Sequence, residues 1–405
     1  MDIEHNSREK FYRFPFGAVT CGGEVRLRLA VSGAGIPSAV RLVYMEDGKG
    51  EVRKDMPYIF DVGDHCIYSV NVKMPEKAGL VWYYFELETE RGMVYYGNNS
   101  KQLGGIGEMC FNSPSNSYQI TVYNEDYKTP DWFKTGIAYQ IFVDRFCNGN
   151  ENGEFLGNRT DIIKRNWGEQ PFYKAEQFGG EYKANDFFGG NLKGVIKKLP
   201  YLKDLGISVI YLNPIFKAYS NHKYDTGDYE TIDPMFGDEE TFKELCSKAK
   251  EMGIRIILDG VFNHTGSNSR YFNKYGEYDS IGAYQSKESP YYTWFRFMDW
   301  PDVYESWWGM TTLPQIEEHS EECRKYLLSD KDAIVKRWIK NGASGWRLDV
   351  VDELPGFFVK ELRENVKKAD KDAVIIGEVW EDASNKSAYG ERREYFLGKE
   401  LDSVM

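Results

Sequence analysis

The stretch NLKGVIKKLPYLKDLGISVIYLNPIF (191–216) contains a helix pattern followed directly by a strand pattern. Its first part spaces apolar residues at helical intervals as far as Gly206, and glycine commonly ends a helix. Its second part, from residue 207, is an almost unbroken apolar run, which is typical of a strand covered on both faces. A helix joined so closely to a buried strand predicts one unit of an α/β fold with parallel strands.

The same alternation continues on both sides of this stretch. The pattern predicts strands at 137–146, 254–262, 345–351 and 374–380, helices at about 238–252 and 355–369, and a mostly helical stretch at 323–342, with Asp238 as the N-cap of the helix at 238–252. This order fits a (β/α)8 barrel, and it also fits an open doubly wound sheet. No Gly-rich phosphate loop follows the first strand, which counts against a nucleotide-binding sheet.

The first part of the chain follows a different rhythm. Up to about residue 125, apolar and polar residues alternate in short runs separated by turn residues, which predicts an antiparallel β-sandwich. The polar stretch 124–136 is the expected linker. We therefore predict a sandwich over 1–127 and a barrel over 128–405. Long excursions at about 147–190 and 265–318, the second an inserted loop domain, are expected at the barrel face that builds active sites.

Composition narrows the range of partners. The 405 residues carry 51 Lys and Arg against 63 Asp and Glu, a net charge of −12, which argues against a nucleic acid or an anionic membrane surface as partner. No run approaches the ~20 apolar residues that span a bilayer. The six cysteines form no CxxC pair and no signal peptide is visible, so we expect reduced thiols in a cytoplasmic protein. A signal peptide lost upstream is the alternative explanation.

Three acidic residues end three of the predicted strands. Asp259, Asp349 and Glu378 each close an apolar run, where an unpaired carboxylate costs desolvation. One such acid is readily explained as a local cap or ion pair, but three at equivalent strand ends favour an active site. Two facing carboxyl groups are the arrangement of glycoside hydrolysis, in which one attacks and the other donates a proton.

The neighbours of two acids suggest different roles. Arg347 lies two residues before Asp349, hence on the same strand face, and is expected to hold that carboxylate ionised as a nucleophile requires. Glu378 is followed by Val379 and Trp380 and has no adjacent base. An apolar pocket would raise its pKa, as a proton donor requires.

Two of the five histidines, His222 and His264, follow strand ends. The sequence contains no HExxH and no His-x-His, so we expect hydrogen bonds to substrate hydroxyls rather than a zinc site. Tyr224 is a candidate for stacking on a sugar ring, and a packed loop tyrosine is the alternative.

These stretches resemble the alpha-amylase family of glycoside hydrolases. The resemblance rests on DGVFNH (259–264), GWRLDVVDE (345–353) and GEVW (377–380), supported by HKYDTGDY (222–229), DRFCNG (144–149) and FFGGNLKGV (187–195). It implies a (β/α)8 barrel and retaining cleavage of α-glucosidic bonds through a covalent glycosyl-enzyme. It also implies that Asp349 is the nucleophile, that Glu378 is the general acid/base and that Asp259 is a supporting acid. The residues implied to line the subsite of the attacked sugar are Arg347, His264, Tyr224 and His222.

Within that family, the chain is similar to the neopullulanase, cyclomaltodextrinase and amylopullulanase group, which also carries a β-sandwich before the barrel. Glu353 stands where endo-acting starch amylases usually have another residue, and it favours pullulan and cyclodextrins over starch. The stretch LPQI (313–316) departs from the MPKL usual in neopullulanases, which leaves the substrate open. We expect α-1,4 or α-1,6 bonds of maltooligosaccharides, pullulan or cyclodextrins to be cleaved.

The resemblance further implies a candidate calcium site and no organic cofactor. Its residues are Asn148, Asn150, Gly189 and Asn191, with amides at 150 and 191 where relatives carry carboxylates. Fewer negative ligands weaken calcium binding, and a solvated Asn/Gly turn is the alternative.

The family's third catalytic acid follows a histidine near the seventh strand. Here LDSVM (401–405) is predicted to start the sixth strand, so we expect an incomplete barrel of about six strands and weak or no turnover by this chain alone. A catalytically inactive glucan-binding or assembly protein with a degenerate barrel is the second hypothesis, and an unrelated α/β enzyme is the third. The sandwich is expected to shape substrate access or to mediate a homodimer.

Overall fold

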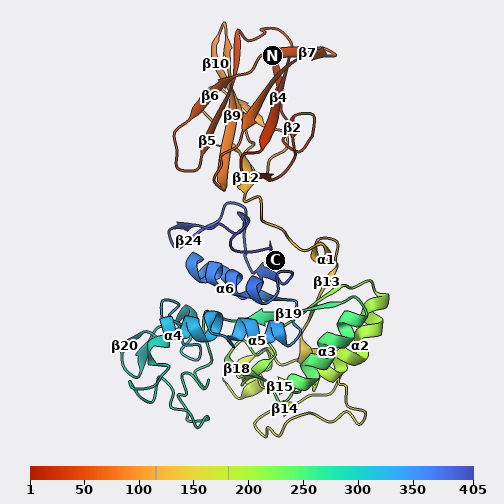
Figure 1. Cartoon of the computed structure of the whole chain (residues 1–405), viewed down its shortest axis with the longest axis vertical. Coiled ribbons are helices and arrows are strands. Elements are labelled where there is room, and N and C mark those ends of the chain that lie inside the picture. The colour runs from red at the N-terminus through yellow and green to blue at the C-terminus, as the bar shows by residue number, and fades with distance from the viewer. Residues whose placement is uncertain (115, 181) are drawn as a thin grey trace. The chain divides into compact units, whose positions relative to one another are not determined.

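The computed structural model describes residues 1–114, 116–180 and 182–405, which divide into two compact units (Figure 1). The first unit is Met1–Lys128 with Glu394–Lys399, and the second is Thr129–Arg393 with Glu400–Met405. The predicted division, 1–127 and 128–405, lies close to the first boundary and assigns residues 394–399 to the barrel. That segment joins the first unit, where the Asn124 N–H donates to the Leu397 carbonyl over 3.1 Å.

Two sheets with one shared core form the first unit. One sheet has the order β1 (Asp2–Glu4), β4 (Glu24–Ser32), β8 (His65–Lys73) and β7 (Tyr58–Val62), with β2 (Arg13–Phe14) also on β4. The other has the order β11 (Glu108–Cys110), β10 (Gly92–Gly97), β9 (Gly79–Thr89), β12 (Tyr118–Tyr123) and β3 (Val19–Thr20), with β5 (Ala39–Glu46) on β9 and β6 (Val52–Asp55) on β5. All pairs are antiparallel except β12 with β3. Alternate residues of β4 and β9 enter one apolar cluster, which confirms the sandwich.

A parallel sheet of six strands forms the second unit. Its order is β13 (Ala138–Ile141), β16 (Val209–Leu212), β19 (Arg255–Gly260), β22 (Gly345–Leu348), β23 (Val374–Gly377) and β26 (Ser403–Val404), so strands adjacent along the sheet follow one another in the chain. A doubly wound sheet would reverse its strand order, whereas a barrel does not. The structure therefore confirms an incomplete (β/α)8 barrel, with β26 as the sixth strand.

The helices of the second unit agree with the sequence pattern except at two places, a short helix within the expected linker and an interruption within 323–342. They are α1 (Asp131–Lys134), α2 (Leu192–Asp204), α3 (Glu239–Glu251), α4 (Glu321–Arg324), α5 (Ile334–Lys340) and α6 (Gly356–Ala369). Asn191 and Asp238 cap α2 and α3 by accepting backbone N–H groups over 2.9 and 2.8 Å. The stretch 323–342 is mostly helical, as predicted, but it is not one continuous helix. A π-helical turn at Lys325–Ser329 follows α4, and Ala333 is extended before α5 begins.

Both long excursions leave the sheet at the carboxyl ends of strands. The first contains the parallel pair β14 (Ile163–Lys164) and β15 (Asp186–Phe187), and the second contains the hairpin β20 (Phe297–Asp299) and β21 (Val303–Tyr304). Two further hairpins join β17 (Phe216–Ala218) to β18 (Thr226–Ile232) and β24 (Ser387–Ala388) to β25 (Glu391–Arg392). Within the described ranges, no helix is both long and apolar enough to cross a membrane.

Candidate active site

One guanidinium joins the three acids at the strand ends. Arg347 lies in β22, and its Nη1 is 3.0 Å from Asp259 Oδ1 and 2.8 Å from Asp349 Oδ1. Its Nη2 is 3.0 Å from Glu378 Oε2. The three carboxyl groups come from β19, β22 and β23 or from the residue that follows each strand. Because these strands are parallel neighbours, their carboxyl ends meet at one edge of the sheet.

The charge balance around Asp349 differs from the sequence prediction. Burial raises the pKa of Asp349 to about 8, with Asp259 and Glu378 acting in the same direction and Arg347 opposing them. Arg347 thus favours the ionised form of Asp349 in the predicted direction, but burial and the two other acids raise the pKa further than Arg347 lowers it. The reason is that one cation is shared among three carboxyl groups in a place with little water.

Asp259 forms the base of the cluster. It is 2% exposed, and it accepts hydrogen bonds from the hydroxyls of Tyr211 and Tyr224, the second over 3.1 Å. Burial raises its pKa, against the effects of Arg347 and the two tyrosines. Because these partners occupy its oxygens, Asp259 orients its neighbours and is poorly placed to attack a substrate.

Glu378 has a cation beside it that sequence reasoning missed. Its Oε2 forms the ion pair with Arg347 and also accepts a hydrogen bond from the Val350 backbone N–H over 2.9 Å. Val350 has a φ of 40°, a left-handed conformation that a β-branched residue rarely adopts. The expectation of an acid without an adjacent base is wrong because the neighbouring strand supplies the arginine.

The two predicted histidines are neutral and lie on either side of Tyr224. His222 Nδ1 accepts the Tyr224 backbone N–H over 3.1 Å, so the ring proton belongs on Nε2. His264 Nε2 donates to the Tyr224 carbonyl over 3.1 Å, and its ring packs 5.2 Å from that of Trp307. Burial lowers the pKa of His222 and brings that of His264 to about 4.

These groups open into a cleft of about 900 Å³, near the upper end of the ~300–1,000 Å³ usual for small-ligand sites. Its lining includes His222, Tyr224, His264, Arg347, Asp349 and Glu378. Sequence reasoning did not single out four other aromatic lining residues, which are Tyr182, Tyr219, Tyr275 and Trp307. For all of them except Tyr219, the available signal is the concentration of aromatic residues in the excursions, including the WW pair at 307–308.

Glu353 does not join this cluster. It ends the 3-10 turn Val351–Glu353 and accepts a hydrogen bond from Trp308 Nε1 over 2.7 Å. The Trp308 ring stacks on that of Trp307 at 5.3 Å and meets that of Trp380 edge-on at 5.7 Å. Glu353 is therefore connected to the cleft through Trp308, which contacts the cleft-lining residues Trp307 and Trp380.

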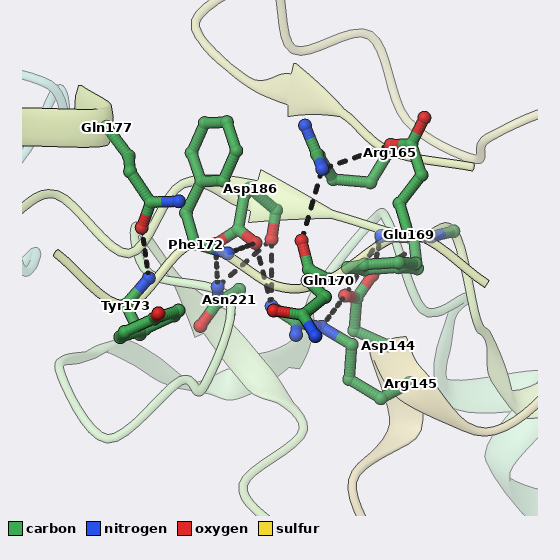
Figure 2. Close-up of polar contacts among 12 residues, drawn as sticks. Asp144, Arg145, Arg165, Glu169, Gln170, Phe172, Tyr173, Gln177, Asp186 and Asn221 are labelled. Atoms are coloured by element: carbon green, nitrogen blue, oxygen red, sulfur yellow. Dashed lines mark hydrogen bonds and ion pairs between the residues drawn. The ribbon is translucent and has the colours of Figure 1, made fainter. Parts of the chain in front are cut away.

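Buried charges hold the base of the first excursion (Figure 2). Arg145 lies 2.8 Å from Asp144 and 3.3 Å from Asp186, and both acids are fully buried. Asp186 Oδ1 also accepts from Asn221 Nδ2 over 2.8 Å, as Figure 2 shows. Asn221 directly precedes His222, so this network links the excursion to the cleft.

The candidate calcium residues come together, but their amides are already engaged. Asn191 Oδ1 accepts the backbone N–H groups of Gly149 and Gly194 over 3.1 and 2.9 Å, which fixes the orientation of this amide. Its Nδ2 therefore faces Asn148 Oδ1 at 3.2 Å and the Gly189 carbonyl at 3.5 Å. An N–H donor thus points at two oxygens that a cation would need.

Asn148 and Asn150 make the same kind of contact. Asn148 Oδ1 accepts the Asn150 N–H over 2.8 Å, and the Nδ2 atoms of both residues donate to the Glu154 carbonyl over 3.1 and 2.7 Å. Among the described residues, no group of three or more His, Cys, Asp or Glu side chains is arranged to hold a metal. Calcium prefers oxygen ligands, several of them carboxylates, so this donor set does not fit it.

Comparison with known proteins gives consistent results. The sequence profile described as "Alpha amylase, catalytic domain" matches residues 140–397. An amylopullulanase of Thermoanaerobacterium saccharolyticum is 39% identical over 434 residues, covering 100% of this chain and 33% of that protein. A cyclomaltodextrinase of Thermoanaerobacter pseudethanolicus is 40% identical over 287 residues, covering 68% of this chain and 43% of that protein.

Solved structures agree with these sequence matches. The type III pullulan hydrolase from Thermococcus kodakarensis superposes with a TM-score of 0.60 and 29% identity, covering 100% of this chain and 64% of that one. The chain thus spans about a third of the amylopullulanase and less than two thirds of this structural neighbour.

Proposed function

The chain belongs to the alpha-amylase family, and on that premise we propose that it carries the bond-cleaving site of a retaining glycoside hydrolase. Its substrates are maltooligosaccharides, pullulan or cyclodextrins, cleaved at α-1,4 or α-1,6 glucosidic bonds. The names of the amylopullulanase, the cyclomaltodextrinase and the pullulan hydrolase that it resembles support this range. Glu353, which favours the pullulan and cyclodextrin side, supports it as well.

The observation that carries this proposal is the bridge from Asp349 through Arg347 to Glu378. Both carboxyl groups contact the same guanidinium, over 2.8 and 3.0 Å, and both line the cleft. Retaining enzymes place their two carboxyl groups ~5–5.5 Å apart, whereas inverting enzymes separate them by ~6.5–9.5 Å to admit a water. Sharing one guanidinium favours the shorter spacing.

In the proposed reaction, Asp349 in its ionised form attacks the anomeric carbon of the bound glucosyl unit. Glu378 donates a proton to the glycosidic oxygen as the bond from that oxygen to the anomeric carbon breaks. Glu378 then takes a proton from water, whose oxygen attacks the same carbon and releases Asp349. Arg347 supplies the positive charge that favours the ionised form of Asp349, and His222 and His264 offer neutral hydrogen-bond partners to sugar hydroxyls.

One observation favours the second candidate function, a glucan-binding site without turnover. Burial and the neighbouring acids Asp259 and Glu378 raise the pKa of Asp349, which disfavours the ionised form that attacks the sugar. We propose that this chain alone turns over slowly and binds glucans well.

The two candidates are separated by measuring binding and hydrolysis on the same protein. We expect the chain to bind maltotriose and to release panose or maltose from pullulan slowly, and Asp349→Asn to bind equally well with no release. Hydrolysis of starch alone would rule out the pullulan and cyclodextrin assignment. An unchanged rate in Asp349→Asn would rule out that residue as the nucleophile.

Two properties of the whole protein are also proposed. The first unit either shapes access to the cleft or joins two copies of the chain, and the mass of the protein in solution separates these roles. All six cysteines lie among the described residues as free thiols, which supports a reducing compartment, the cytoplasm.

A further inference from the structure

The four residues Asn221–Tyr224 face alternate directions. His222 and Tyr224 line the cleft, whereas Asn221 and Lys223 are buried, with exposures of 5% and 0%. Lys223 has a φ of 65°, in the left-handed region that residues other than glycine seldom adopt. A strained, fully buried lysine between two cleft residues calls for a compensating interaction.

That interaction is an ion pair beneath the cleft. Lys223 Nζ lies 2.7 Å from Asp233 Oδ2, whose side chain is 2% exposed, and donates to the Ala218 carbonyl over 3.1 Å. The ammonium also lies over the rings of Phe187 and Phe236, at 5.0 and 5.3 Å. A buried ammonium is stable only when it is paired and hydrogen-bonded, so these partners fix its position closely.

Asp233 is itself held by the backbone. Its Oδ1 accepts the Met235 N–H over 2.9 Å and its Oδ2 accepts the Ala218 N–H over 3.2 Å. The carboxylate is therefore a fixed point to which Lys223 attaches. On the other side of His222, Asn221 is tied to Asp186 (Figure 2), and its backbone N–H donates to the Ala184 carbonyl over 2.7 Å.

We propose that Lys223 is a positioning residue, whose buried pair with Asp233 holds residues 222–224 so that His222 and Tyr224 face the cleft. Displacing this segment would disturb several contacts at once. Tyr224 gives its N–H to His222, its carbonyl to His264 and its hydroxyl to Asp259. The expected effect of losing Lys223 on ligand binding rests on the proposed glucan site. The expected effect on the positions of the His222 and His264 rings does not.

The test compares Lys223→Met with Lys367→Met, a matched control. Lys367 also pairs with a buried carboxylate, 2.9 Å from Asp402, and does not line the cleft. The chain has only five histidines, so nitrogen NMR of their rings resolves each site. We expect the signals of His222 and His264 to shift in Lys223→Met and to stay in place in Lys367→Met. The signals of His5, His65 and His319 should not move in either variant.

Calorimetric titration with maltotriose provides the second readout. We expect the affinity to fall about tenfold or more in Lys223→Met, and to remain within about twofold of wild type in Lys367→Met. A wild-type chain that does not bind maltotriose contradicts the proposed function, while the NMR comparison still decides the role of Lys223.

A double variant distinguishes a change in the position of residues 222–224 from a general loss of stability of the folded chain. It also serves in place of Lys223→Met if that variant does not fold. Lys223→Met with Asp233→Asn removes both charges, so no unpaired carboxylate remains buried. We expect its melting temperature to recover relative to Lys223→Met, while the His222 signal and the maltotriose affinity stay altered. Wild-type histidine signals in either folded variant would overturn the proposal.

Discussion

Trp308 Nε1 donates a hydrogen bond over 2.7 Å to Glu353 Oε1, and the two residues lie 45 positions apart in the chain. Trp308 belongs to the second excursion, whereas Glu353 ends the turn after β22, the strand that carries Arg347. This bond therefore fastens the excursion to the part of the sheet that carries Arg347 and the three acids. It also sets the Trp308 ring beside Trp307 and Trp380, which line the cleft.

Replacing Trp308 with phenylalanine should weaken substrate binding more than folding. The variant keeps an aromatic ring and loses the N–H, and because Trp308 is 64% exposed we expect a stability loss below ~1 kcal/mol. KM for pullulan should rise ~3–10-fold, with kcat within about twofold, since the wall of the cleft is displaced and the carboxyl groups are not. Trp167→Phe, on an exposed tryptophan that does not line the cleft, is the control and should change neither constant.

Asp349→Asn should stabilise the second unit at high pH. The folded-state pKa of about 8 lies above the ordinary 3.8, so the folded chain holds a proton there that the unfolded chain releases. Stability is therefore lost as the pH rises from about 4 to about 8, and the amide removes this loss. We expect the variant to gain at least ~2 kcal/mol more at pH 8 than at pH 4, relative to wild type.

Urea unfolding followed by tryptophan fluorescence measures this difference, because every tryptophan except Trp82 lies in the second unit. Asp131→Asn provides the control, since Asp131 is exposed and pairs with Lys134. An equal effect of Asp349→Asn at both pH values would show that the carboxyl is ionised throughout.

Asp238→Ala should show the opposite dependence on pH. Hydrogen bonds from Thr241 lower the pKa of this N-cap, so its contribution is present above about pH 4 and is lost as the pH falls below that value. Loss of the cap should cost ~1 kcal/mol at pH 7 and little at pH 2–3. Asp238→Asn keeps an acceptor and should retain most of the stability, and a uniform cost across pH would exclude the charged cap as the cause.

Calcium should have no effect on the wild-type chain. Its melting temperature is expected to agree within about 1 °C in EDTA and in calcium chloride, because the Asn191 amide already occupies the oxygens of the candidate site. Asn191→Asp keeps the cap of α2 and replaces the N–H donor with a carboxylate oxygen, so this variant should gain calcium-dependent stabilisation. Asn166→Asp, an exposed change in the first excursion, should not. A calcium-dependent wild type would contradict the amide arrangement.

Much of this barrel was accessible from the sequence because its signals are local. The capping role of Asp238 needs only the residues of one turn, and the apolar runs of β16 and β19 identify strands buried on both faces. The grouping of Asp259, Asp349 and Glu378 follows as soon as the strands are parallel neighbours. Here short-range pattern and topology point to the same arrangement.

The remaining features depend on contacts between distant segments. The ion pair between Arg347 and Glu378 joins β22 to the end of β23, so it cannot be predicted from the residues adjacent to Glu378 in the sequence. The sequence around Lys223 is typical of a loop lysine exposed to solvent. Its buried pair with Asp233 is visible only in the folded structure. The break before α5 has a local cause that periodicity alone overlooks, since Asp330 and Asp332 favour caps over helix interiors.

The segment Glu394–Lys399 gives the chain an unusual order of assembly. Residues 1–128 are made before the second unit and contain every strand of the sandwich, yet the first unit also includes six residues made some 265 positions later. During synthesis, the contacts between the sandwich and this segment therefore form only after most of the second unit has emerged. The same threading means that separating the two units requires cuts on both sides of this segment as well as after Lys128.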